Sequence, residues 1–384
     1  MILGIDASNI RSGGGVTHLT ELLREIEPAS FGIKRIVIWG GDVLKGLENR
    51  PWLEKRSPVA LSKGILRRAL WQRFSLSKVV RNEGCDVLFI PGGSYAGNFH
   101  PVVTMSRNLL PFDMSELKRY RWSFTGFRLL LLRRSQVYSF RRVDGLIFLT
   151  DYACKAVTRI TGKLNAKYCI IPHGLNARFT KTPKIQYDIT KYDEAHPYRI
   201  LYVSIIDLYK HQWYVVEALA ILRKLGLPIV LDLIGPAYLP ALKMLNAAIA
   251  QVDTDRSWVH YHGAIAFETL HKYYEQADLG LFASSCENMP NILLETMASG
   301  LPIACSNRGP MPEVLGQAGV YFDPEQPKDI ARALQELIES TQLRTKLSNA
   351  SYELAQQFSW KRCAQETFQF LVDVKKQKDS KCAG

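Results

Sequence analysis

Short runs rich in β-branched and aromatic residues alternate with amphipathic helical patterns along nearly the whole chain. Parallel strands need a crossover between them, usually a helix, so this alternation predicts parallel α/β architecture. The rhythm occurs twice in a chain of 384 residues, which is long for one ordinary domain. We therefore expect two doubly wound domains, each with its own core.

The pattern places strands and helices at definite positions. Strands are expected at 2–6, 35–39, 86–90, 102–105, 145–149 and 168–171, and then at 199–203, 229–234, 258–261, 279–283, 302–305 and 320–322. Helices are expected at 16–26, 151–160, 213–225, 241–252, 267–276, 291–298, 327–340 and 343–357. A polar stretch without clear period, 176–197, is interpreted as the linker. The predicted domains are 1–175 and 190–357, followed by a C-terminal helix and tail over 358–384.

The charge is unevenly distributed between the two halves. Residues 1–185 hold 30 Lys and Arg against 13 Asp and Glu, whereas 186–384 hold 19 against 23. Such asymmetry favours an anionic partner for the first half. The seven cysteines are scattered and form no Cys-x-x-Cys pair, and the N-terminus carries no signal-peptide pattern. We therefore expect a cytoplasmic protein without disulfides.

Two segments carry candidate chemistry. The glycines Gly13, Gly14 and Gly15 lie between a strand and a helix, where backbone N–H groups can contact a phosphate or sugar, although a simple tight turn fits equally well. The second segment runs from 284 to 302 and places Glu287 in a loop and Glu295 about one turn into a helix. Two carboxylates so placed can hold two hydroxyl-bearing groups, while two solvated surface glutamates are the simpler alternative.

The second segment resembles the Glu-x7-Glu motif of retaining glycosyltransferases of the GT-B fold, family 4 (glycosyl transferases group 1). The frame around it also matches, through Leu301-Pro302-Ile303, Gly309-Pro310-Met311-Pro312-Glu313 and Gly319-Val320-Tyr321-Phe322-Asp323-Pro324. The similarity is specific over about 198–340 and looser over 1–175. It implies two Rossmann-like domains facing across a cleft, with the acceptor bound by the first and a nucleotide-sugar donor by the second.

The resemblance also implies roles for single residues. Glu295 would bind the donor ribose, Glu287 the transferred sugar, and Lys210 the diphosphate. Further donor contacts would come from Gly14 and Gly15 of the first domain and from Gly235, Ile265, Asn288, Met289 and Asn291 of the second. Asn108 takes the place where some relatives carry a catalytic-site histidine. The histidines His18, His173 and His211 are expected to be structural or rim residues rather than general bases.

The chain departs from the family pattern in places that bear on phosphate binding. Many relatives have Gly-Arg where this chain has Ser204-Ile205, so one usual diphosphate cation is missing, and Arg308 or Arg11 are the substitutes that we consider. Pro290 follows the first glutamate and donates no N–H. We expect no cofactor and no metal dependence, because Lys210 and helix N–H groups can neutralise a diphosphate.

Two basic segments interleave cations with aromatic residues. Residues 118–143 contain Lys118, seven arginines, six aromatic residues and no acidic residue, and residues 63–81 repeat the combination around Trp71 and Phe74. This pattern is typical of a surface that docks on anionic lipid. A solvated basic face or a single-stranded nucleic-acid surface are the alternatives, and the absence of any nucleic-acid-binding signature disfavours the latter.

These observations predict a peripheral membrane enzyme that transfers a sugar to a lipid-linked saccharide, as in lipopolysaccharide or O-antigen assembly. Two alternatives stay open. One is a sugar-nucleotide hydrolase or epimerase of similar fold, and the other is a non-catalytic sugar-nucleotide-binding protein.

Overall fold

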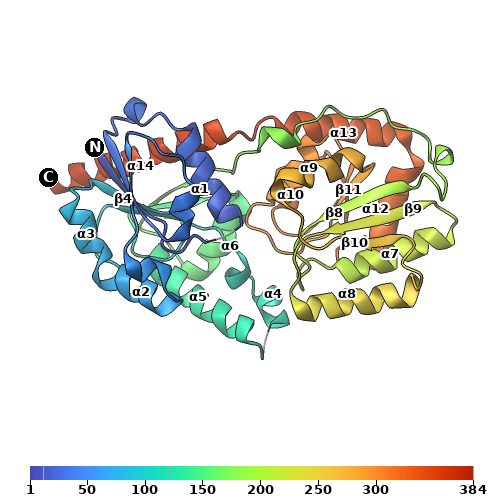
Figure 1. The fold of residues 1–384 in the computed structure, drawn as a ribbon, viewed down its shortest axis with the longest axis horizontal. Helices are drawn as coiled ribbons and strands as arrows, with labels where there is room; N and C mark the ends of the chain where they lie inside the picture. The colour runs from blue at the N-terminus through green and yellow to red at the C-terminus, as the bar shows by residue number, and fades with distance from the viewer. Residues whose placement is uncertain (12, 121, 384) are drawn as a thin grey trace. The chain divides into compact units, whose positions relative to one another are not determined.

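The computed structural model describes residues 1–11, 13–120 and 122–383, with side chains given up to residue 380. The chain divides into two compact units. The N-terminal unit comprises residues 1–174 together with the segment from Ser359 onward, and the C-terminal unit comprises Leu175–Phe358. Each unit is built on one parallel β-sheet (Figure 1).

The N-terminal unit holds a seven-stranded sheet in the order β3-β2-β1-β4-β5-β6-β7. Its strands are β1 (Ile2–Asp6), β2 (Arg35–Trp39), β3 (Leu53–Arg56), β4 (Val87–Ile90), β5 (Val102–Met105), β6 (Gly145–Phe148) and β7 (Lys167–Ile170). Its α-helices are α1 (Gly14–Glu25), α2 (Ile65–Phe74), α3 (Leu76–Asn82), α4 (Met114–Arg119), α5 (Phe124–Phe140), α6 (Asp151–Thr161) and α14 (Trp360–Ala383). Short 3-10 turns lie at Pro28–Phe31, Asp42–Gly46, Val59–Ser62 and Leu110–Phe112.

The C-terminal unit holds a six-stranded sheet in the order β10-β9-β8-β11-β12-β13. Its strands are β8 (Tyr198–Val203), β9 (Ile229–Ile234), β10 (Val259–Tyr261), β11 (Leu279–Phe282), β12 (Ile303–Ser306) and β13 (Val320–Phe322). Its α-helices are α7 (Gln212–Lys224), α8 (Leu239–Val252), α9 (Phe267–Gln276), α10 (Asn291–Ala298), α11 (Met311–Leu315), α12 (Pro327–Glu339) and α13 (Thr341–Ala355). Figure 1 shows α7 and α8 on one side of this sheet and α9, α10 and α13 on the other.

The central strands of both sheets are buried on both faces, which is why they read as continuous apolar runs. Strand β3 was not predicted. Its sequence Leu53-Glu54-Lys55-Arg56 has one apolar residue, and as the edge strand it pairs only with β2. An edge strand can carry charged side chains, so hydrophobic periodicity gives no signal there.

The stretch expected as a linker packs on the C-terminal unit. The backbone N–H of Lys181 donates to the carbonyl of Ala298 at 2.9 Å, and the Lys184 ammonium donates to the carbonyl of Ala277 at 2.9 Å. The buried Arg344 of α13 donates through Nε to the side-chain oxygen Oε1 of Gln186 at 3.1 Å. The boundary between the units therefore falls at Gly174, and residues 175–197 are part of the C-terminal unit.

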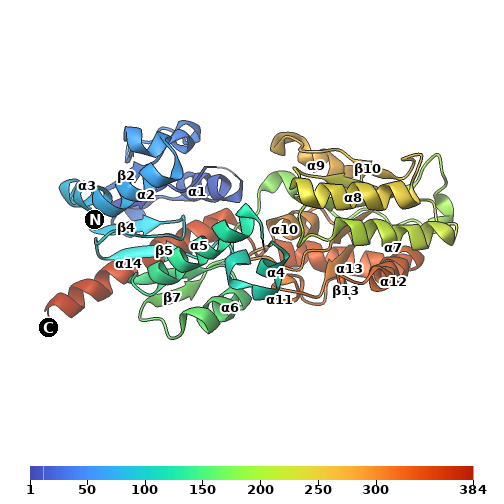
Figure 2. The same ribbon diagram turned by 90° about the horizontal axis from the view of Figure 1, so that it is seen from below.

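The last helix, α14, belongs to the N-terminal unit although it follows the C-terminal unit in sequence. It packs against α1, and its residues Phe368 and Leu371 are buried (Figures 1 and 2). A Cβ on Gly145 of β6 would lie 2.8 Å from Val374, so the glycine allows this helix to approach the sheet closely. No helix in the described part of the chain has the length and apolar character needed to cross a bilayer.

Candidate functional site

The order of the C-terminal sheet has one switch point. Strand β8 pairs with β9 on one side and with β11 on the other, so the connections after β8 and β11 leave toward opposite faces of the sheet. The loops that follow these two strands are therefore neighbours. In open α/β sheets this is the crevice where ligands bind.

Lys210 and Glu287 form an ion pair at this point. The Lys210 ammonium donates to Glu287 Oε1, and the two side chains are 6% and 16% exposed. Lys210 lies in the loop after β8, and Glu287 in the loop after β11. The ammonium also lies 5.0 Å from the centroid of the Tyr209 ring and 5.2 Å from that of Phe282. The pair is thus held in an environment where water screens charge weakly.

A second set of contacts fixes the two loops against each other. The backbone N–H of Ser285 donates to the Tyr209 carbonyl at 2.9 Å, and His211 Nε2 lies 2.9 Å from Ser285 Oγ. Tyr202 of β8 donates its hydroxyl to the Lys210 carbonyl at 2.8 Å. His211 is buried between these two loops.

Glu295 lies on α10 and is 8% exposed. Its carboxylate accepts a hydrogen bond from the Tyr274 hydroxyl at 3.3 Å. Burial raises the pKa of Glu295 to about 8, and the Tyr274 hydrogen bond and the Arg178 charge only partly offset this. Sequence reasoning did not identify Arg178, which lies in the 3-10 turn Ala177–Phe179 and stacks on Phe267.

The segment between the two glutamates is largely buried. Met289 is 7% and Asn288 5% exposed, and α10 begins directly after Pro290. The backbone N–H of Asn291 donates to the Met289 carbonyl at 3.0 Å, so that N–H is already engaged. The side-chain Oδ1 of Asn291 is buried and has no hydrogen-bond partner in the described residues. The side-chain oxygen of Asn291 is therefore a candidate for a polar ligand contact.

Gly235 and Ile265 lie beyond the ends of β9 and β10. Gly235 has a φ of 148°, and a Cβ there would collide with the carbonyl oxygen of Ser204. Its backbone N–H donates to the Gly263 carbonyl at 2.8 Å. This places the residues after β9 beside those after β10, where the half-buried Ile265 follows.

The three other candidates belong to the N-terminal unit. Gly14 and Gly15 open α1, and a Cβ on Gly15 would lie 2.7 Å from Arg107 Nη1. Burial lowers the pKa of the Arg107 guanidinium to about 10. Asn108 follows β5, is exposed, and accepts the backbone N–H of Leu110 at 3.1 Å through its own Oδ1. Sequence reasoning did not single out Arg107, although it directly precedes Asn108.

The arginine missing from the loop after β8 has no evident substitute in the C-terminal unit. Ile205 is 37% exposed at that position. Arg308, on the loop after β12, donates to Asp323 Oδ2 at 2.8 Å and is engaged there. Arg11 belongs to the N-terminal unit and is exposed.

Asp253 and Asp255 are two acidic residues that directly follow α8. The Asp253 carboxylate accepts backbone N–H groups from Ser257 at 2.8 Å and from Val259 at 2.8 Å. It therefore closes the turn that leads into β10. This role is structural.

Comparison with known proteins finds a family match within the C-terminal unit. The family Glycosyl transferases group 1 matches residues 188–354. O-antigen chain mannosyltransferase B of Escherichia coli is 31% identical over 119 residues, which are 31% of this chain and 31% of that protein. D-inositol 3-phosphate glycosyltransferase of Paenarthrobacter aurescens is 27% identical over 181 residues, 45% of this chain and 43% of that protein. The chain thus spans less than half the length of these curated relatives.

Solved structures match almost the whole chain. Sucrose-phosphate synthase from Thermosynechococcus elongatus aligns with a TM-score of 0.73 and 18% identity, covering 96% of this chain and 98% of that one. WaaG, a glycosyltransferase involved in lipopolysaccharide biosynthesis, aligns with a TM-score of 0.68 and 14% identity, covering 97% of this chain and 99% of that one. HepE from Anabaena in complex with UDP-glucose aligns with a TM-score of 0.67 and 18% identity, covering 99% of each chain. These likenesses, together with the two parallel-sheet units, confirm the predicted α/β fold of GT-B type.

Proposed function

We propose that this chain is a retaining, family 4 type glycosyltransferase that moves a sugar from a nucleoside-diphosphate sugar to an acceptor hydroxyl. The observation that carries the proposal is the buried Lys210–Glu287 pair at the β8/β11 switch point of a Glycosyl transferases group 1 domain. A cation and a carboxylate side by side suit a donor that presents a diphosphate next to a hydroxylated sugar.

Each part of the donor would contact a different residue of the C-terminal unit. Its diphosphate would draw the Lys210 ammonium away from Glu287, and the freed carboxylate would accept hydrogen bonds from the sugar hydroxyls. Glu295 would accept the ribose hydroxyls, and the base would lie near Gly235 and Ile265. HepE, a structural neighbour, was solved with UDP-glucose, which supports a nucleotide-sugar donor here.

The chemistry would rest on stabilising the leaving group. As the glycosidic bond breaks, negative charge builds on the departing diphosphate, and the weakly screened Lys210 would stabilise it without a metal ion. The acceptor hydroxyl would attack from the face that the diphosphate leaves, so the anomeric configuration is retained. We assign no covalent nucleophile.

The N-terminal unit would bind the acceptor, and Gly14, Gly15 and Asn108 are its candidate contact residues. We propose a lipid-linked saccharide in surface-polysaccharide assembly as the acceptor. The names of two similar proteins point that way, an O-antigen chain mannosyltransferase and a glycosyltransferase involved in lipopolysaccharide biosynthesis.

The surface of α2 and α5 supports peripheral attachment to the inner face of an anionic membrane. Trp122 is 96%, Phe124 82% and Leu66 78% exposed, although large apolar side chains usually pack inside. Both helices contact one loop, α2 through Gln72 on the Ser94 carbonyl and α5 through Ser139 on Tyr95. Figures 1 and 2 show the two helices next to each other. Arg121, within the basic segment 118–143, lies outside the described residues.

A thermal-shift screen with uridine, guanosine, adenosine and thymidine diphosphate sugars tests the donor assignment. A ligand bound only by the native state raises its stability, so one donor class should raise the Tm of the wild type and not of Lys210→Ala. No shift with any donor would contradict donor binding. Consumption of the donor without an acceptor would indicate a hydrolase or epimerase, and saturable binding without turnover would indicate a binding protein.

A further inference from the structure

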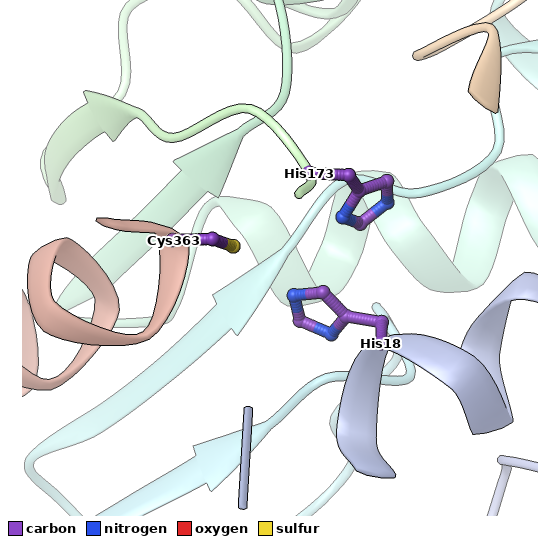
Figure 3. Close-up of side chains that lie close together, drawn as sticks. All are labelled: His18, His173 and Cys363. Atoms are coloured by element: carbon purple, nitrogen blue, oxygen red, sulfur yellow. The ribbon is translucent and has the colours of Figure 1, made fainter. Parts of the chain in front are cut away.

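Three side chains from distant parts of the sequence meet inside the N-terminal unit (Figure 3). His18 comes from α1, His173 from the residues that follow β7, and Cys363 from the first turn of α14. All three are buried, and one ligand atom of each lies within 4.8 Å of those of the other two. The cluster belongs to neither the donor site nor the lipid-docking surface proposed above.

Each of the two imidazoles leaves one buried ring nitrogen without a hydrogen bond in the described residues. Their ring centroids are 4.7 Å apart, and Nδ1 of each is buried without a hydrogen-bond partner in the described residues. Trp360 packs on both rings and offers them an apolar surface. A buried polar atom without a partner costs about 1 to 3 kcal/mol, so two of them in one cluster call for a physical explanation.

The protonation states suit metal coordination. Burial, with the nearby Arg107 charge adding to it, lowers the pKa of His173 to about 3 and holds that of His18 well below its usual value. Metal coordination takes the neutral form of an imidazole. Burial raises the pKa of the Cys363 thiol to about 12, but a bound metal ion deprotonates a coordinating thiol outright.

We propose that His18, His173 and Cys363 form a binding site for a thiophilic divalent metal ion, zinc, which fastens α14 to α1 and to the turn after β7. Two imidazoles and one thiolate are a donor set that zinc accepts, with the fourth tetrahedral position left to water. Tetrahedral zinc ligands lie about 3.5 Å apart, so small side-chain rotations complete the geometry. The thiolate also offsets part of the metal charge beside Arg107.

The position of the site gives the metal a structural role. Residue 174 is where the chain leaves the N-terminal unit, and residue 359 is where it returns. A metal bound here would clip the outgoing and returning segments to the start of α1. This proposal rests on the three side chains alone, so it holds or fails independently of glycosyl transfer.

Cobalt substitution tests the site in the full-length protein. Metal-stripped wild type titrated with Co²⁺ should bind one ion per chain and develop the near-ultraviolet thiolate-to-cobalt band and the visible bands of tetrahedral Co²⁺, which zinc then bleaches. Free zinc at about 100 times its Kd should raise the Tm by roughly 5 to 10 °C.

Single variants identify the ligands. Cys363→Ser should lose the charge-transfer band and the zinc-induced Tm shift, whereas Cys154→Ser, which alters a half-buried cysteine of α6, should keep both. If Cys363→Ser does not fold, the wild-type spectrum still decides, since the charge-transfer band requires a thiolate ligand. Wild type without this band and without a zinc-induced shift would overturn the proposal, as would a band that persists in folded Cys363→Ser.

Discussion

At the scale of single residues, Lys210 and Glu287 are the pair on which the proposed chemistry depends. The sequence indicated each of them as a donor contact but not that they bind each other. They are 77 positions apart, and only the pairing of β8 with β11 brings their loops together. Because sheet order is a tertiary property, local periodicity could not reveal this ion pair.

Replacing Lys210 by alanine should therefore affect both activity and stability. The loss of the cation should lower kcat/KM by about 10² to 10³ fold, as for other groups that stabilise a leaving group. It should also cost about 3 to 5 kcal/mol of unfolding free energy, because Glu287 stays largely buried without its partner.

Arg308→Ala is the matched control for this substitution. It removes a cation from the same sheet edge, but its pair with Asp323 is half exposed, so stability should change by less than about 1 kcal/mol. Steady-state kinetics and urea unfolding measure both effects. Equal losses in the two variants would show that position 210 is not special.

The raised pKa of Glu295 predicts that the stability of the protein depends on pH. Its folded-state pKa is raised to about 8, whereas an unperturbed glutamic acid has a pKa of 4.5. Between these two values the folded state holds a proton that the unfolded state has released, so stability falls as pH rises, by up to about 1.4 kcal/mol per pH unit. Glu295→Gln removes this dependence. Its stability relative to wild type should increase from pH 5 to pH 8, as urea unfolding at several pH values would show.

A difference between wild type and Glu295→Gln that does not change with pH would contradict the burial of an ionisable group at position 295. Turnover gives a separate readout. If Glu295 accepts the donor ribose hydroxyls, the glutamine variant should show an increased KM for the donor even where it is the more stable protein.

At the scale of elements, Gly235 shows how a strand end is shaped for close approach. The sequence predicted that a glycine here lets a donor approach, and the closest neighbour in the structure is the backbone of Ser204. Gly235→Ala should thus displace the loop after β8 that carries Lys210.

A second glycine provides the comparison. Gly226 also has a positive φ, 83°, but a Cβ there would meet nothing within 4 Å. Gly226→Ala should cost only the backbone strain of about 1 to 2 kcal/mol. Gly235→Ala should cost more and should also weaken donor binding, measured by thermal shift with and without donor. Equal destabilisation by Gly235→Ala and Gly226→Ala would contradict a steric clash at position 235.

The helices α2 and α5 carry a prediction about membranes. Wild type should sediment with anionic liposomes, and Arg133→Glu/Arg134→Glu should reduce the bound fraction several-fold. The double variant Lys328→Glu/Lys346→Glu changes the charge equally on exposed positions of α12 and α13, and it should bind like wild type. Binding should weaken with salt, since lipid charge is screened. Binding that is insensitive to salt and to both double variants would contradict docking through this surface.

At the scale of the whole molecule, the α/β rhythm was sufficient to predict the fold. Most central strands appeared at their expected positions because parallel strands buried on both faces leave a strong apolar signal. The edge strand β3 and the packing of residues 175–197 escaped prediction. The packing of residues 175–197 depends on long-range contacts such as that of Arg344 with Gln186. A polar sequence without a period gives no signal for such contacts.

The candidate site was predictable to a different degree. Its two carboxylates were predicted from the Glu-x7-Glu motif and its lysine from the family resemblance, whereas Arg178, Arg107 and the cluster of His18, His173 and Cys363 were not predicted as site residues. Each of these lies next to its partners only through tertiary packing. His18 and His173 were expected to be structural or rim residues. The proposed zinc site would make them structural as metal ligands.

Acceptor-dependent transfer measures directly whether this protein is a retaining glycosyltransferase. Wild type is incubated with the donor found by thermal shift and with a lipid-linked saccharide fraction, and the product is analysed by NMR. We expect a new glycosidic bond with the anomeric configuration of the donor, dependent on the acceptor and lost in Lys210→Ala. An inverted configuration would contradict retention, and transfer undiminished in Lys210→Ala would contradict the site itself.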